Sequence, residues 1–244
     1  MSFKDGSRYL TRELVEALGG MIVRGDAPAG ESLPIEAELS KQFNASRTVI
    51  REAVKMLTAK GLVGSRPRRG TYVEPESEWN ILDPDVLRWT LQRRFTLELM
   101  REFLITRKAI EPAAAREAAK RGDPDAIAEI GRCLDAMRDA ATGGADPLEA
   151  DIAFHLAILE ASGNRFFRQF SFVVETALRF SIRLTNRAKG VRAASVEDHA
   201  AIYHAIAKGS VRKAARAVEA LLDEALQLID LLEDQEVGEA SEPA

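Results

Sequence analysis

Apolar residues recur at every third or fourth position along most of the chain, which is the spacing of one buried face of an α-helix. Clusters of glycine, proline, asparagine and aspartate interrupt this pattern and mark where helices begin and end. The expected helices span residues 8–24, 36–43, 46–59, 84–94, 97–121, 124–141, 146–162, 164–188, 194–208 and 210–233. The pattern therefore predicts a mostly α-helical fold.

One stretch departs from the helical pattern. Residues 62–65 and 70–73 are typical of two short strands, and they bracket the basic turn Arg66-Pro67-Arg68-Arg69. With the three helices before it, this small β wing predicts a winged helix-turn-helix over residues 1–74. The tight turn of the motif is expected at Phe43-Asn44-Ala45, between its second and third helices.

The rest of the chain is expected to form a linker, a second domain and a tail. Residues 75–83 are short and polar and predict the linker. Residues 84–233 contain helical patterns alone and predict an all-α helical bundle. Residues 234–244 are acidic and small, so we expect them to be disordered.

Composition limits the class of protein. The 244 residues are 46% hydrophobic, enough to bury a substantial core. The single cysteine, Cys133, cannot form an intrachain disulfide, which fits a reducing compartment. No apolar run approaches the roughly 20 residues that span a bilayer, and the first residues lack the apolar region of a signal peptide. We therefore expect a cytoplasmic protein without a membrane partner.

The charge distribution is uneven. The chain carries a net charge of −4, which alone argues against nucleic-acid binding. Residues 41–70, however, contain eight basic residues against the single acid Glu52, a local charge of +7, and the remainder carries −11. A basic block on an acidic body is typical of a DNA-binding module attached to another domain.

The predicted third helix carries the candidate DNA-reading residues. Ser46, Arg47, Thr48 and Arg51 occupy its first turns, and Arg47 and Arg51 share a face because they are four residues apart. Arginine can bind guanine through two hydrogen bonds, while hydroxyls bind phosphates or base edges. The wing would add Arg66, Arg68 and Arg69 at the backbone or minor groove. The alternative is an ordinary helical hairpin with a solvated basic face.

Three residues of the second domain form a candidate metal site. Asp151 and His155 lie four residues apart on one helix face, and His199 begins a later helix. Carboxylate and imidazole are suitable ligands for first-row transition metals. The alternative is an ion pair or a capped core histidine. The remaining histidine, His204, follows His199 by five residues and should point elsewhere.

A lone arginine among apolar neighbours is the candidate anion site. Arg107 lies on the long helix expected over 97–121, and a buried arginine requires an anion. That anion is either a ligand carboxylate or Glu111, one helical turn further on.

The first domain resembles the GntR superfamily of transcriptional regulators. The resemblance rests on Gly30-Glu31-Ser32-Leu33-Pro34-Ile35-Glu36-Ala37-Glu38-Leu39, Ser46-Arg47-Thr48-Val49-Ile50-Arg51-Glu52-Ala53 and Arg69-Gly70-Thr71-Tyr72-Val73. It implies DNA-reading roles for Arg47 and Arg51 and a wing role for Gly70. A position of the second helix that often holds a DNA-contacting arginine is Ala37 here.

Residues 84–230 resemble the ligand-binding domain of the fatty-acid-regulator (FCD-type) branch of that superfamily. The matching residues are Arg107-Lys108-Ala109-Ile110-Glu111, Asp151-Ile152-Ala153-Phe154-His155, Ser162-Gly163-Asn164, and Glu197-Asp198-His199 followed by Ala205-Ile206. The resemblance implies a divalent transition metal, zinc in the first place with nickel and manganese as alternatives, on Asp151, His155 and His199.

The branch's fourth ligand, a histidine, falls at Leu221, so the site is either lost or holds its metal with positions left open. A chelating effector could fill such open positions. The resemblance also places Arg107 in an effector pocket, with Arg183, Asn186 and Ser195 as weaker candidates for effector contacts.

Residues 79–89 resemble the interdomain segment of sugar-acid-responsive members of this branch, which also lack the fourth histidine. We therefore expect a homodimeric repressor that binds a palindromic operator and is released by an aldonate such as galactonate, or by a related hexonate or uronate. Alternatives are a regulator of the same class responding to a dicarboxylate, an amino acid, an acyl thioester or the metal itself. A metal-dependent hydrolase is less favoured, because no general base or nucleophile accompanies the three ligands.

Overall fold

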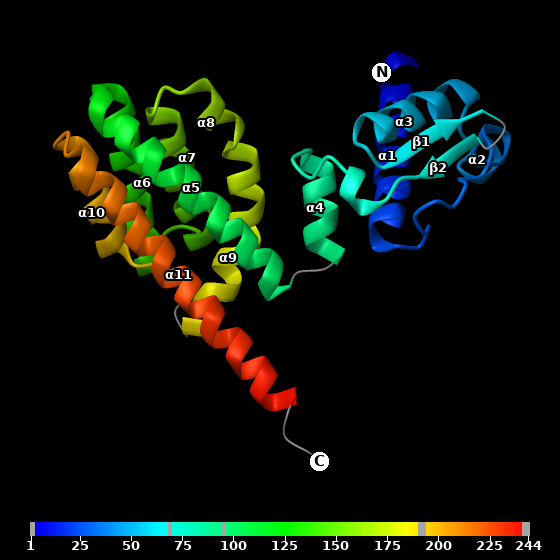
Figure 1. Cartoon of the computed structure of the whole chain (residues 1–244). Helices are drawn as coiled ribbons and strands as arrows, with labels where there is room; N and C mark the ends of the chain where they lie inside the picture. The colour runs from blue at the N-terminus through cyan, green and yellow to red at the C-terminus, as the bar shows by residue number, and fades with distance from the viewer. Residues whose placement is uncertain (1–2, 68–69, 94–95, 190–193, 241–244) are drawn as a thin grey trace. The chain divides into compact units, whose positions relative to one another are not determined.

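The computed structural model describes residues 3–67, 70–93, 96–189 and 194–240, with side chains described for residues 9–181 and 194–234 within these ranges (Figure 1). The chain divides into two compact units, residues 1–94 and 95–244. The described residues are mostly helical, and their one sheet has two strands, as the sequence predicts.

The first unit is a winged helix-turn-helix. Its elements are α1 (Phe3–Arg24), α2 (Glu36–Gln42), α3 (Arg47–Ala59), β1 (Val63–Arg66), β2 (Gly70–Val73), a short 3-10 helix η1 (Glu76–Glu78) and α4 (Pro84–Arg93). The strands pair antiparallel with Val63 opposite Val73 and Arg66 opposite Gly70, so the wing turn follows Arg66. The expected motif is therefore present, with α3 as its third helix.

Local hydrogen bonds fix the turn between α2 and α3. Asn44 adopts the left-handed conformation at φ 47°, which asparagine tolerates better than most residues. The hydroxyl of Ser40 donates to the carbonyl of Ala45 at 2.5 Å. Ser46 then caps α3, because its side-chain oxygen accepts a hydrogen bond from the backbone N–H of Val49. The N-terminal end of α3 is thus held by residues of the turn itself.

Helix α4 packs on the first unit, against α1. The ring of Trp89 is 3% exposed and covers Gly19 so closely that a Cβ at that glycine would lie 2.3 Å from the ring. The indole Nε1 donates to Glu16 at 2.8 Å, and Arg88 binds both oxygens of the same carboxylate. Glycine is required at position 19 because any larger residue would separate the two helices.

A buried lysine ties the segment after the wing to α3. Lys60, at the C-cap of α3, donates to Asp83 at 2.7 Å and to Asp85 at 2.8 Å. Burial lowers the pKa of Lys60, but its hydrogen bonds to the two carboxylates outweigh burial and raise the pKa above its usual value. Lys60 therefore belongs to this internal network and not to the exposed basic surface in which the sequence count included it.

These contacts change the expected domain boundary. The sequence suggested a linker at 75–83 and a second domain from 84, whereas both segments pack within the first unit. The two units instead join at residues 94 and 95, which lie outside the described residues. A polar composition concealed the packing, because Asp83 and Asp85 are charged residues that pair internally.

The second unit is a helical bundle. Its helices are α5 (Leu97–Arg121), α6 (Pro124–Thr142), α7 (Pro147–Ala161), α8 (Arg165–Gln169), α9 (Ser171–Lys189), α10 (Val196–Ala207) and α11 (Val211–Ala240). Aspartates cap α6 and α7 immediately before prolines at their first helical position. The long helices α5 and α11 lie side by side, and α7 packs against α5, α6 and α9 around an aliphatic core (Figure 1).

Two helical expectations for this unit are wrong in detail. The helix expected over 164–188 is interrupted at Phe170, which caps α8 before α9 begins. The last helix continues to Ala240, so residues 234–240 are helical and not a disordered tail. Residues 241–244 lie outside the described residues. Among the described residues, no helix combines the length and apolar composition needed to cross a membrane.

Candidate DNA-binding surface and metal centre

The start of α3 presents the predicted DNA-reading side chains. Arg47 is the first residue of the helix, and it and Thr48 are exposed. The opposite face of the helix is buried through Val49, Ile50 and Ala53. Because the helix N-terminus also attracts phosphate, this end of α3 combines a free guanidinium, a hydroxyl and exposed backbone N–H groups.

Arg51 lies one turn further along α3 and has a partner on α2. Its Nε donates to both carboxylate oxygens of Glu36, at 3.0 and 2.8 Å. Both side chains are largely exposed, so this ion pair contributes little to stability and can be exchanged for a DNA contact. The family position at Ala37, beside Glu36, remains half-buried and without charge.

The wing supplies a further cation. Arg66 ends β1, is exposed, and lies over the ring of Tyr72 at 4.7 Å from its centre. Gly70 begins β2 at φ 77°, a left-handed conformation that favours glycine. Arg68 and Arg69, which the sequence also suggested, lie outside the described residues.

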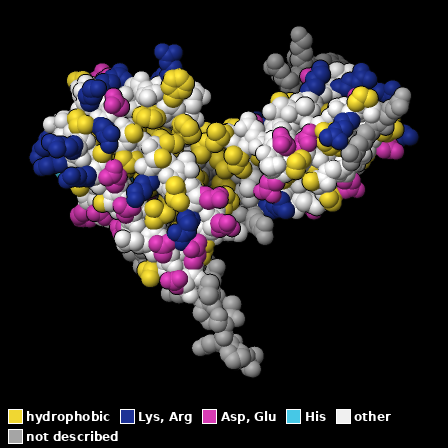
Figure 2. All heavy atoms as spheres, in the orientation of Figure 1, with side chains coloured by type: hydrophobic (Ala, Val, Ile, Leu, Met, Phe, Trp, Pro, Cys, Tyr) yellow, Lys and Arg dark blue, Asp and Glu magenta, His cyan; other side chains and the backbone are white. Residues whose placement is uncertain are grey.

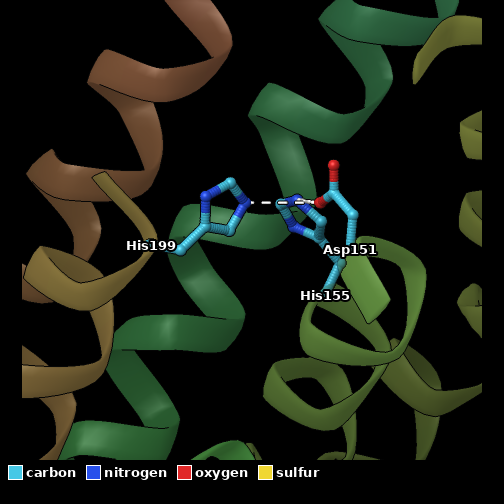
Figure 3. A group of neighbouring side chains, drawn as sticks. All are labelled: Asp151, His155 and His199. Carbon is cyan, nitrogen blue, oxygen red and sulfur yellow. Dashed lines mark ion pairs between the residues drawn. The ribbon is translucent and has the colours of Figure 1, made fainter. Parts of the chain in front are cut away.

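The three predicted metal ligands meet in the second unit. Helix α7 contributes Asp151 and His155, and α10 contributes His199; all three are at most 4% exposed. Their ligand atoms lie within 4.8 Å of one another. The Nε2 atoms of both histidines are 3.3 Å from Asp151 Oδ1. Figure 3 shows the ring of His199 pointing across to the carboxylate of Asp151, beside the ring of His155.

Two atoms of this cluster are buried without a hydrogen-bond partner, Asp151 Oδ1 and His199 Nε2. An unsatisfied buried polar atom is costly, so such a pair of atoms requires an explanation. A cation between them would satisfy both, and one carboxylate with two imidazoles is a donor set that zinc and similar metals accept. The residues present therefore fit a divalent transition metal.

Neighbouring groups set the tautomers of both histidines. His199 Nδ1 lies 2.7 Å from the carbonyl oxygen of Ser195, to which it donates. His155 Nδ1 lies 2.9 Å from Glu111 Oε2. With the Nδ1 protons held in these bonds, each ring directs Nε2 toward Asp151, as outer partners of metal-binding histidines commonly do.

Arg107 has an internal partner. Its Nε and Nη2 donate to the two carboxylate oxygens of Glu111 at 2.5 and 3.1 Å, and Nη2 lies 3.3 Å from both ring nitrogens of His155. Of the two anions considered from the sequence, the structure contains the ion pair with Glu111. Arg107 nevertheless lies directly against a candidate metal ligand.

Electrostatics favour the charged forms of the acids. Burial raises the pKa of Glu111, but the charges of Arg107 and His155 outweigh burial and lower it to about 2. Burial likewise opposes ionisation of Asp151, yet the two imidazoles hold its pKa well below the usual range. Burial lowers the pKa of His155, but the charge of Glu111 outweighs it and raises the pKa. A metal bound at His155 would therefore compete with a proton for the ring.

The other residues that the sequence suggested for effector or metal contacts do not all lie at this cluster. Ser195 uses its hydroxyl to cap α10 through Asp198 N and its carbonyl to hold His199, so its described contacts position a ligand. The side chains of Arg183 and Asn186, on α9, lie outside the described residues. Leu221 is half-buried on α11 and offers no ligand atom. The sequence suggested Glu111 only as a partner for Arg107, and its contact with His155 was missed. The four-residue spacing that puts Glu111 on the same face of α5 as Arg107 was the available signal.

Each of the two units matches a known protein family. The family described as "Bacterial regulatory proteins, gntR family" matches residues 10–73, and the FCD domain matches residues 102–224. The galactonate operon transcriptional repressor of Escherichia coli K12 is 34% identical over 197 residues, covering 80% of this chain and 86% of that protein. The uncharacterized HTH-type transcriptional regulator YieP of the same organism is 34% identical over 217 residues, covering 88% and 93%.

A solved structure supports the fold. The structure of Lar, a protein described as controlling expression of the Listeria monocytogenes agr system, matches with a TM-score of 0.57 at 19% identity, covering 91% of this chain and 97% of that one. The relatives are regulators of transcription, so the hydrolase alternative is set aside. The chain belongs to the GntR family of bacterial regulatory proteins and, through its second unit, to the members that carry an FCD domain.

Proposed function

We propose that this regulator is a repressor of sugar-acid catabolic genes whose effector binds beside a metal in the second unit. The observation that carries the proposal is a pair of buried ligand atoms, Asp151 Oδ1 and His199 Nε2, which lie 3.3 Å apart and make no hydrogen bond. The name of the galactonate operon repressor supports the effector class. DNA binding would use Ser46, Arg47, Thr48 and Arg51 of α3, with the wing residues Arg66, Arg68, Arg69 and Gly70.

Asp151, His155 and His199 would hold a divalent metal, with zinc preferred and nickel or manganese as alternatives. When bound, the metal supplies Lewis-acid positions for the carboxylate and a neighbouring hydroxyl of an aldonate. Leu221 leaves room in the ligand set, because a leucine stands where the branch places a fourth ligand. Three protein ligands with a further position open are the arrangement of sites that bind an exogenous ligand.

Arg107 would stabilise the remaining negative charge of the effector. Its guanidinium is buried and borders His155, so a carboxylate at the metal would lie near it. Arg107 would then be shared between Glu111 and the effector. Arg183, Asn186 and Ser195 stay weaker candidates for contacts to effector hydroxyls.

Effector binding changes DNA affinity only if it binds two arrangements of the protein unequally. Because α4 packs on the DNA-binding unit, the change would pass through the chain after Arg93. We also propose a homodimer, which would present two copies of α3 to the half-sites of a palindromic operator.

A thermal-unfolding series with and without a chelator tests the effector class. A ligand at 100 times its Kd raises the free energy of unfolding by about 2.7 kcal/mol. We expect galactonate or a related aldonate to raise Tm in zinc-loaded protein and to have no effect after chelation. A rise that zinc alone produces, unchanged by any acid, would favour a metal-responsive regulator. A rise with a dicarboxylate, amino acid or acyl thioester alone would replace the sugar acid.

Glu111 provides a prediction about ligand positioning. Glu111→Gln keeps an acceptor for His155 Nδ1 but removes the charge, so we expect zinc affinity to fall about tenfold, the lower end for outer partners of metal ligands. Competition with a chromophoric chelator measures this. Glu102→Gln, an exposed change on the same helix, is the control. Equal affinities for the two variants would show that Glu111 does not position His155.

A further inference from the structure

The second unit carries a second block of positive charge, far in sequence from the winged motif. Its members are exposed residues at the C-terminal half of α5, the turn between α10 and α11, and the first turns of α11: Arg116, Lys120, Lys208, Arg212, Lys213 and Arg216. We call this set the distal basic surface. Figure 2 shows dark-blue side chains gathered at the left edge of this unit, over these segments.

The packing of α5 on α11 brings these residues together. The helices run antiparallel, since Arg101 pairs with Asp230 while Lys108 pairs with Asp223. Continuing that register places Lys120 beside the start of α11. The turn before α11 lies at the same end, because a Cβ on Gly209 would be 3.6 Å from the carbonyl oxygen of Ala119.

The basic residues at one end of the α5–α11 pair have carboxylate partners, whereas most of those at the other end have none among the described ion pairs. At the paired end, Arg101 and Lys108 each have a carboxylate partner on α11. Residues 116–121 and 208–216 instead contain seven basic residues against the single acid Glu117, a local charge of +6. Among the described ion pairs, Arg121 alone of these seven has a carboxylate partner, Asp123. With the +7 of residues 41–70, the rest of the chain carries −17. Positive charge in this acidic protein is therefore gathered in blocks, of which the winged motif and the distal basic surface are two; residues 179–192, with five basic residues and no acid, form another.

Helix stability does not explain the distal basic surface. Lys120 and Lys208 lie at helix C-termini, where cations are favourable. Arg212 and Lys213, however, occupy the first turn of α11, at the positive end of the helix dipole, and that turn has no acidic residue. Arg212 and Arg216 also repel each other at i, i+4 spacing. These cations therefore make α11 less stable, and we infer that they serve a function other than stabilising the helix.

We propose that the distal basic surface binds the phosphate backbone of DNA outside the operator bases contacted by α3. Lysine and arginine alone are enough for phosphate contacts, which carry no sequence information. A protein partner would be expected to use exposed aromatic or large apolar anchors. Among the described residues, the large exposed hydrophobics all lie outside 116–121 and 208–216. The inference depends on the family's DNA binding and is independent of the effector.

The salt dependence of DNA binding tests this proposal in the full-length protein. The probes are the footprinted operator as a minimal duplex and the same operator with about 20 base pairs of unrelated sequence on each side. Each phosphate contact contributes about 0.9 to the slope of log K against log salt. For Lys120→Gln/Arg212→Gln/Lys213→Gln, we expect the slope on the extended duplex to become shallower by about 2.7, the value for three lost contacts. The slope on the minimal duplex should not change.

The matched control removes three cations that have carboxylate partners in the same unit: Arg132→Gln/Arg138→Gln/Arg179→Gln, whose partners are Glu129, Asp135 and Glu149. This variant has the same net charge and should keep the wild-type slope on both duplexes. Equal slopes for the two triple variants on the extended duplex would overturn the proposal. Tm of the distal variant should equal or exceed that of the wild type, and a fall would contradict the electrostatic argument. If the wild type does not bind the minimal operator, the assignment of operator binding to the winged motif is wrong.

Discussion

Replacing His155 with alanine is expected to lower zinc affinity by more than about 100-fold, beyond the range for losing an outer partner of a ligand. The variant removes one of three ligand atoms, and Asp151 and His199 alone cannot complete a tetrahedral site. It also leaves Arg107 and Glu111 beside a space where the imidazole had been. Zinc-dependent stabilisation should therefore disappear, together with any aldonate effect on Tm.

Calorimetric titration with zinc measures the loss, and differential scanning fluorimetry with and without chelator measures its effect on Tm. His204→Ala is the matched control, because His204 lies on the same helix as His199 but is exposed. It should retain wild-type affinity. If His155→Ala lowers Tm while zinc stabilises it as much as the wild type, the cluster is an ion-pair network that supports the fold and no metal site.

Replacing Arg47 with alanine is expected to cost about 1–3 kcal/mol of operator binding and to relax specificity at one base pair, the range for an arginine that contacts guanine. Arg47 is exposed at the first position of α3 and has no carboxylate partner among the described ion pairs. By contrast, Arg51 must exchange Glu36 for DNA, so its replacement should have a smaller effect.

Fluorescence anisotropy at fixed salt, on the operator and on single-base variants of it, measures both quantities. Arg24→Ala serves as the control, since Arg24 is an exposed arginine of the same unit that pairs with Asp26. If Arg47→Ala lowers the affinity for the operator and for every single-base variant by the same factor, Arg47 contacts a phosphate and not a base. Unchanged binding would show that α3 does not read the operator through this residue.

The sequence predicts most of the fold because the ends of most helices are set by residues close to them in the chain. Ser46 and the Asp–Pro pairs before α6 and α7 end or begin helices through contacts within a few residues. The sequence alone placed Asp151 and His155 on one helix face, a spacing that an ion pair or a capped core histidine explains as well as a metal does. Joining His199 to them required the family resemblance, since 44 positions separate it from His155.

Long-range packing explains what the sequence could not provide. Helix α4 belongs to the first unit because Trp89 packs on Gly19, 70 positions away. Lys60 looked like part of the DNA-binding surface until its pairing with Asp83 and Asp85 was visible. Glu111 was one of two possible anions for Arg107, and only three-dimensional contacts show that it also holds His155.

We propose that a sugar acid, bound beside a metal on Asp151, His155 and His199, releases this regulator from DNA. Operator binding should therefore be titrated with galactonate and related aldonic and uronic acids, in zinc-loaded protein, chelated protein and Arg107→Ala protein. One sugar acid should dissociate the zinc-loaded complex, and either chelation or Arg107→Ala should prevent this release. Release that is equally effective after chelation, or operator binding that no sugar acid disturbs, would contradict the proposed function.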